Sequence, residues 1–125
     1  MLKLLLITLT LFFLGCDKKI EPKPEQDKVN MIFITQVGCG ACEQIKGYMK
    51  KPDIKAILDK DFIVKEVDIT NKEDFPFKWM QPYATPTLYF FDKKDHEIID
   101  HTVRRMSEKD FTDTLEEVID IRDMD

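Results

Sequence analysis

The strongest constraint on the fold of this chain is the pair Cys39 and Cys42, which follows an apolar run, Met31–Ile34, and opens a helical pattern, Gly40–Met49. In the first turn of a helix the backbone N–H groups lack intrahelical partners, and the macrodipole adds partial positive charge. A thiolate placed there is stabilised, so its pKa falls from about 8.5 toward ~7. Because the thiolate is the attacking form, we predict that Cys39 is the nucleophile of thiol–disulfide exchange. Cys42, one turn further on, is then the resolving thiol.

Other roles for this cysteine pair remain open. A structural disulfide is disfavoured, because closing a loop of about 4 residues recovers only ~2 kcal/mol of chain entropy, against ~4.7 kcal/mol for a loop of 100 residues. A zinc site needs four ligands, and the sequence has no second cysteine pair. Copper(I) held by the two soft thiolates is the alternative from a different functional class, although no third ligand is evident. The sequence therefore favours redox chemistry without a metal.

The overall composition describes a globular protein, with 43% hydrophobic and 34% charged residues. At 125 residues, less an export segment, the chain has room for one domain. A net charge of −5 argues against a nucleic-acid partner, because binding phosphates requires a basic surface. The adjacent Arg104 and Arg105 are interpreted as a solvated pair between two elements.

The N-terminal residues 1–15 have the pattern of a signal peptide. Lys3 supplies a positive charge, and Leu4–Leu14 form an apolar run of about 11 residues, where a bilayer span needs roughly 20. Phe13-Leu14-Gly15-Cys16 resembles the lipobox of bacterial lipoproteins, in which the peptide is cut before the cysteine and that cysteine carries lipid. We therefore predict a lipid anchor on Cys16, which also accounts for the odd third cysteine. An ordinary signal peptide with an incidental cysteine remains the alternative.

Residues 16–28 are predicted to be the lipidated cysteine and a flexible tether, because they are rich in charge and proline and poor in apolar side chains. About 12 extended residues reach about 40 Å, which would hold a domain over residues 29–125 clear of the membrane. Asp17 directly after the lipidated cysteine favours retention in the inner membrane of enteric bacteria. We expect the periplasmic side of the bacterial inner membrane, with the outer membrane as the alternative.

From residue 29 onward the patterns of hydrophobicity predict alternating strands and helices. Lys50-Lys51-Pro52 should break the first helix, and a capping box of Ser107 with Asp110 should start the last one. The predicted strands are Met31–Thr35, Phe62–Ile69, Thr87–Phe91 and Glu97–Val103. The predicted helices are Gly40–Met49, a second helix after Pro52 that continues toward Leu58, a short helix in Asn71–Met80 interrupted at Pro76, and a last helix with the apolar stripe Phe111, Leu115, Val118 and Ile119.

This order of elements resembles the thioredoxin fold over residues 29–122. The likeness also depends on the spacing between Cys39-Gly40-Ala41-Cys42 and Ala84-Thr85-Pro86-Thr87-Leu88, and on Val67-Asp68 at the end of the second strand. It implies an α/β protein with a central mixed four-stranded sheet flanked by helices. It also implies that the Thr85–Pro86 bond is cis and that Pro86 faces the cysteine pair, an ordinary trans turn being the alternative.

The same resemblance implies a thiol–disulfide oxidoreductase whose partners are protein thiols and disulfides. The backbone of Thr85 beside Pro86 would bind an extended substrate segment, together with Gly38, Gly40 and Ala41. No cofactor is implied; electrons would come from an upstream dithiol protein, and we expect a monomer. Net reduction is the preferred direction. A binding adaptor on a redox-inactive fold is disfavoured because both cysteines are present.

Two departures from the family concern the surroundings of the cysteines. Gly38 stands where the family typically has tryptophan, and Phe33 stands where thioredoxins have a buried acid that assists proton removal from the resolving thiol. Glu43, Lys65 or water could take over that task. The dipeptide Gly40-Ala41 is neither of the pairs that mark strong reductants and strong oxidants, so the sequence leaves the redox potential open.

Overall fold

The computed structural model describes Pro24 and residues 27–124. The predicted signal peptide, Cys16 and nearly all of the tether lie outside the described residues. The helices and strands of the described part begin at Val29 and end at Asp123.

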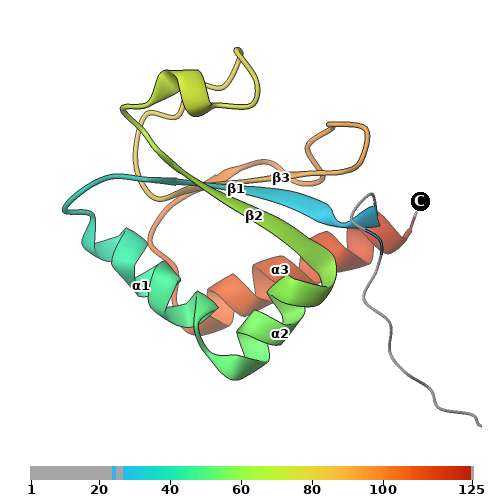
Figure 1. The fold of residues 1–125 in the computed structure, drawn as a ribbon. Coiled ribbons are helices and arrows are strands. Elements are labelled where there is room, and N and C mark those ends of the chain that lie inside the picture. The colour runs from blue at the N-terminus through green and yellow to red at the C-terminus, as the bar shows by residue number, and fades with distance from the viewer. Residues whose placement is uncertain (1–23, 25–26, 125) are drawn as a thin grey trace, which may run out of the picture.

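Three α-helices, one short 3₁₀ helix and four strands make up the described part of the chain (Figure 1). In chain order they are β1 (Val29–Thr35), α1 (Gly40–Met49), α2 (Pro52–Asp61), β2 (Phe62–Asp68), η2 (Lys72–Asp74), β3 (Thr87–Phe91), β4 (Thr102–Val103) and α3 (Glu108–Asp123).

The strands form one mixed sheet in the order β2-β1-β3-β4. Strand β1 pairs in parallel with β2 and antiparallel with β3, and β3 pairs antiparallel with β4. The central strand β1 is buried along Met31–Thr35, which explains its continuous apolar sequence. Each large apolar side chain buried there stabilises the fold by about 1.5–3 kcal/mol. The predicted mixed four-stranded sheet flanked by helices is confirmed.

The two faces of the sheet are covered differently (Figure 1). Helices α1, α2 and α3 lie on one face, where Phe33, Leu88 and Phe90 of the sheet pack with Phe111 and Leu115 of α3. The segment between β2 and β3 covers the other face, and its members in this second cluster are Ile69, Phe75, Phe77 and Met80, packed on Ile32, Ile34, Val67, Tyr89 and Phe91. In the described part of the chain, α-helices therefore lie on the first face only, and the cysteine pair is on one of them, α1.

The predicted helix in Asn71–Met80 is wrong except for the single turn η2. Pro76 lacks an N–H donor and disfavours a helical conformation in the residue before it, so a longer helix cannot form through this point. The aromatic side chains of the segment act as a cover instead. The ring of Trp79 packs against Tyr89 and Phe91 at centroid distances of 6.2 and 6.0 Å while about half of the residue stays exposed, and Tyr83 is more exposed still.

The predicted strand Glu97–Val103 is also largely wrong, because only Thr102–Val103 pairs as a strand and Glu97 makes one isolated bridge with Phe91. Side-chain contacts shape the part between them. The ring of His101 stacks on Tyr89 with centroids 4.5 Å apart, and its Nδ1 lies 3.0 Å from a Glu97 carboxylate oxygen. Within the described residues, no group of three or more histidine, cysteine, aspartate or glutamate side chains is arranged to hold a metal ion.

None of the helices in the described part is both long and apolar enough to span a bilayer.

Helix α3 begins with the predicted capping box. The Asp110 N–H donates to the Ser107 hydroxyl at 3.0 Å, and the Ser107 N–H donates to the Asp110 carboxylate at 3.3 Å. Hydrogen bonding of the Asp110 carboxylate with the backbone N–H of Ser107, and then with its hydroxyl, holds the pKa of Asp110 below its usual range. The stabilisation from Asp110 is therefore present above the pKa of the unfolded chain and is lost as pH falls through the lower folded pKa.

We predict that Ser107→Ala lowers the free energy of unfolding by about 1 kcal/mol, because the Asp110 N–H then loses its side-chain acceptor. The measurement is urea unfolding at pH 7, followed by circular dichroism. Glu116→Ala, on the exposed side of the same helix, is the control and should change stability by under about 0.5 kcal/mol. Equal stability of the two variants would contradict the capping role.

Candidate active site

A tight turn delivers Cys39 from the end of β1 to the start of α1. The Cys39 N–H donates to the Gln36 carbonyl at 3.1 Å, and Gly38 has φ +82°. A positive φ at the third residue of such a turn is typical of type II, and glycine adopts it without strain. This turn explains why glycine suits the position before Cys39. It also leaves Val37 almost fully exposed, at 93%.

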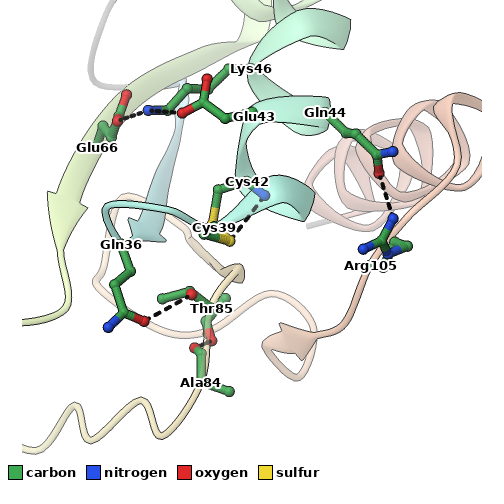
Figure 2. The surroundings of a disulfide bond; sticks show 11 residues. Gln36, Cys39, Cys42, Glu43, Gln44, Lys46, Glu66, Ala84, Thr85 and Arg105 are labelled. Atoms are coloured by element: carbon green, nitrogen blue, oxygen red, sulfur yellow. Dashed lines mark hydrogen bonds and ion pairs between the residues drawn. A yellow bond between two sulfur atoms is a disulfide. The ribbon is translucent and has the colours of Figure 1, made fainter.

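The two cysteines form a disulfide at the N-terminus of α1, with their Cα atoms 5.2 Å apart (Figure 2). Cys39 is the N-cap residue, and its sulfur accepts a hydrogen bond from the Cys42 N–H at 3.1 Å. Cys39 is partly exposed, whereas Cys42 is buried at 1% exposure. A bond donated to sulfur favours a thiolate at Cys39, and the exposure allows a partner to reach that sulfur first. Gly40 and Ala41, the residues between them, open the helix at its exposed end.

The predicted proline segment borders the same site. The Thr85–Pro86 peptide bond is cis, as predicted. The Thr85 hydroxyl donates to the Gln36 side-chain oxygen at 3.5 Å, which links the segment to the turn before Cys39 (Figure 2). Among residues 27–124, no backbone hydrogen bond occupies the Thr85 N–H or C=O. These two groups are therefore available to an extended segment of another chain.

Cys42 packs in an apolar cluster together with Phe33, the residue that replaces the family's buried acid. The suggested substitute Lys65 is wrong, because Lys65 lines a cleft on the opposite face of the sheet with Ile32 and Phe77. Glu43, the other suggested substitute, forms an ion pair, since its carboxylate lies 3.3 Å from the amine of Lys46.

Lys46 joins this site to strand β2. Its amine also lies 2.9 Å from a carboxylate oxygen of Glu66 (Figure 2). Hydrogen bonds to Glu66 and then to Glu43 raise the pKa of Lys46. Glu66 pairs in register with Phe33 across β1 and β2, so the pair Lys46–Glu66 lies beside the position of the missing acid. Sequence analysis missed this ion pair, because its two members are 20 positions apart and meet only through the β1–β2 pairing.

A third segment reaches the site from β4. Val103 pairs with Thr87, so Arg104 and Arg105 leave the sheet next to Pro86. The Arg105 guanidinium donates to the side-chain oxygen of Gln44 at 3.4 Å (Figure 2). The prediction that the two arginines form a solvated pair between two elements is confirmed, since both are exposed and lie between β4 and α3. The β3–β4 register adds what the sequence does not reveal, namely their place next to Pro86.

Solved structures show which known fold this arrangement matches. No protein-family model matches the chain, and no curated protein matches it at a significant level. A thioredoxin from Thermus thermophilus superposes with a TM-score of 0.60 at 20% identity, covering 74% of each chain. The chain has the thioredoxin fold. A disulphide isomerase from Xylella fastidiosa Temecula1 superposes with a TM-score of 0.59 at 17% identity, covering 75% of this chain and 80% of its own.

A further match is a thioredoxin from Malassezia sympodialis, with a TM-score of 0.57 and 23% identity over 73% of this chain and 75% of its own. The thioredoxin fold thus accounts for the placement of the cysteine pair and Pro86, while the identities leave the activity to be argued from the site itself.

We predict that the Cys39 thiol of the reduced protein titrates well below the usual value of about 8.5 and toward ~7, because the α1 N-terminus stabilises its thiolate. The measurement is the pH dependence of alkylation by iodoacetamide in the full-length Cys42→Ser variant, with mass spectrometry to assign the reaction to Cys39. The same variant in urea is the control, since unfolding removes the helix and should restore the ordinary pKa. An unchanged titration on unfolding would contradict the prediction.

Proposed function

We propose that this protein is a thiol–disulfide oxidoreductase, exported and anchored by lipid, that reduces disulfides of other proteins. The observation that carries the proposal is the hydrogen bond from the Cys42 N–H to the Cys39 sulfur at the start of α1. This bond stabilises the Cys39 sulfur, which a partner can reach, while the sulfur of Cys42 is buried beside it. The N–H and C=O of Thr85, which make no backbone hydrogen bond among residues 27–124, lie next to the site.

The reaction proceeds in two displacements. The Cys39 thiolate attacks one sulfur of the substrate disulfide, the substrate S–S bond breaks, and a substrate thiolate leaves and takes up a proton. Cys42 then loses its proton and attacks the Cys39 sulfur of the mixed disulfide. The second substrate thiolate leaves and is protonated, and the Cys39–Cys42 disulfide forms. Two electrons have passed to the substrate, and an upstream dithiol protein must return them.

The surface around the disulfide fits a protein substrate. The Thr85 N–H and C=O offer one rung of strand pairing, which recognises peptide backbone without demanding particular side chains. Val37, exposed in the turn before Cys39, adds apolar contact area. Gly38 and Gly40 have open space where a side chain would stand, so a partner can approach the sulfur closely.

The copper(I) alternative fits the site less well. Copper(I) held by this pair would need both sulfurs as ligands, and Cys42 is almost completely buried. In contrast, a resolving thiol works from a buried position, because it attacks a sulfur that is already bonded to its neighbour.

Export and anchoring are supported by the sequence alone. The signal-like residues 1–15 and the lipobox-like residues ending in Cys16 would place a lipid on the chain, and residues 17–28 would serve as the tether. Reduction is the proposed direction, because an anchored thiol protein in an oxidising compartment can keep particular thiols reduced.

We predict that the reduced full-length protein reduces the disulfides of insulin and that Cys39→Ser abolishes this activity. Cys42→Ser should instead accumulate a mixed disulfide between Cys39 and insulin, because nothing displaces the captured chain. Non-reducing electrophoresis with mass spectrometry detects that species. Titration of the reduced protein with copper(I) in parallel tests the alternative.

Equal activity of wild type and Cys39→Ser would contradict the proposed function. Tight copper(I) binding without insulin reduction would replace it with the metal-binding alternative. The direction is tested by the reduction potential of the pair: a value near about −270 mV supports a reductase, and one near about −120 mV would assign an oxidase.

We predict that Cys16→Ser releases the protein from membranes. In bacterial cells grown with a labelled fatty acid, the wild type should carry label and sediment with the membrane fraction, since several acyl chains anchor stably. Cys39→Ser is the matched control and should keep both label and location. Unlabelled wild-type protein would contradict the lipid anchor.

A further inference from the structure

Arg104 and Arg105 lie in the segment that follows β4, close to Pro86 and to helix α1. The β3–β4 ladder ends with Thr87 opposite Val103, so Arg104 and Arg105 leave the sheet beside Pro86 and Thr85. Neighbouring strands lie about 4.8 Å apart. A side chain of a segment bound to the Thr85 backbone is therefore within reach of a long arginine side chain.

The arginine pair is held in place from α1. The Tyr48 hydroxyl donates to the Met106 carbonyl at 3.0 Å, and Met106 is buried at 2% exposure. The Arg105 guanidinium donates to the side-chain oxygen of Gln44, which lies two residues after Cys42 in α1. Figure 2 shows Arg105 reaching toward Gln44 from the segment that follows β4. Two contacts thus connect this segment to the helix that carries the cysteines.

The positive charge of Arg105 is available to a partner. Its side chain is exposed, and in the described part of the chain it hydrogen-bonds a neutral amide and forms no ion pair. The positive charge of Arg104 is partly neutralised by Asp110, whose carboxylate lies 3.6 Å from the guanidinium, while 55% of the Arg104 side chain remains exposed.

On the β2 side, Glu43, Lys46 and Glu66 form a cluster that together carries one negative charge. The site is thus positive toward β4 and negative toward β2, although the whole chain has a net charge of −5. Screening at physiological salt acts over about 8 Å, so a bound substrate side chain responds to these local groups more than to the whole protein.

We propose that Arg104 and Arg105 select substrates with a carboxylate side chain within about two residues of the reactive cysteine. This inference rests on the proposed function and names its substrate class: proteins whose exchangeable disulfide has an acidic flank. Guanidinium groups suit this role because they present several N–H donors in a plane that matches a carboxylate. The same groups repel a lysine or arginine at that substrate position.

The test uses three disulfide peptides of identical sequence except for glutamate, glutamine or lysine beside the reactive cysteine. The reduced full-length protein, in a non-ionic detergent, is assayed for kcat/KM with each peptide. At low salt we expect the glutamate peptide to react about tenfold faster than the lysine peptide, with glutamine between them, since an exposed ion pair changes affinity by up to about fivefold. At about 0.5 M NaCl the ratio should fall to about twofold.

The double variant Arg104→Glu with Arg105→Glu should invert the order of the glutamate and lysine peptides. Lys93→Glu with Lys94→Glu is the matched control, because it makes the same change in net charge on an exposed adjacent pair beyond the opposite end of β3, and it should keep the wild-type ratio. A ratio of rates within one preparation is insensitive to altered reactivity of the Cys39 thiolate.

Equal rates for the three peptides with the wild type would overturn this inference and leave the proposed function standing. An unchanged order in the arginine double variant would overturn it as well. Absence of reaction with all three peptides would overturn the proposed function and this inference together.

Discussion

The contact between the Cys42 N–H and the Cys39 sulfur is the interaction on which the rest of the site depends. It exists because Cys39 is the N-cap of α1, where the backbone donors of the first turn have no intrahelical acceptors. A sulfur at this position serves as the cap that serine or aspartate provides elsewhere. The chemistry of the site is therefore built from an ordinary requirement of helix ends, and the helix is aligned by the packing of α1 on the sheet.

The sheet determines what surrounds that sulfur. Strand β1 ends at Thr35, directly before the turn to Cys39, and β3 begins at Thr87, directly after Pro86. Because β1 and β3 are antiparallel neighbours, the end of one lies beside the start of the other. The pairing of β3 with β4 adds the segment of Arg104 and Arg105 at the same edge. Strand pairing thus brings three segments that are distant in the sequence to the same edge of the sheet.

The second face of the sheet is buried by an irregular segment instead of by helices. No α-helix of the described residues covers it; Phe75, Phe77 and Met80 pack on it from an irregular segment. Proline prevents a long helix in that segment, and aromatic side chains supply the apolar area instead. The edge of the sheet beside the cysteine pair is therefore supported from both faces, by helices on one and by aromatic packing on the other.

Most of the fold could be predicted from local patterns. The strand Thr87–Phe91 and the helix Gly40–Met49 have the predicted bounds, since each is marked by a continuous apolar run or by a cap. The prediction of a strand over Glu97–Val103 is wrong except at its end, because local sequence does not reveal which residues pair: only Thr102–Val103 joins the sheet, while the His101 ring stacks on Tyr89. Local sequence carries the signal for an element, but a contact between distant side chains can override it.

Local sequence alone was enough to predict the parts of the candidate site, which are two thiols at the start of a helix and a Thr-Pro segment before a buried strand. Those features are local, because capping and the restricted backbone of proline act within a few residues. The charges around the Cys39 sulfur could not be predicted in this way, because they depend on how distant segments pack. In the folded protein Lys65 lies on the opposite face of the sheet, Lys46 pairs with Glu66, and Arg105 bonds to Gln44 of α1. The physical reason is strand register, since it sets which residues of separate strands become neighbours and which face of the sheet each side chain enters.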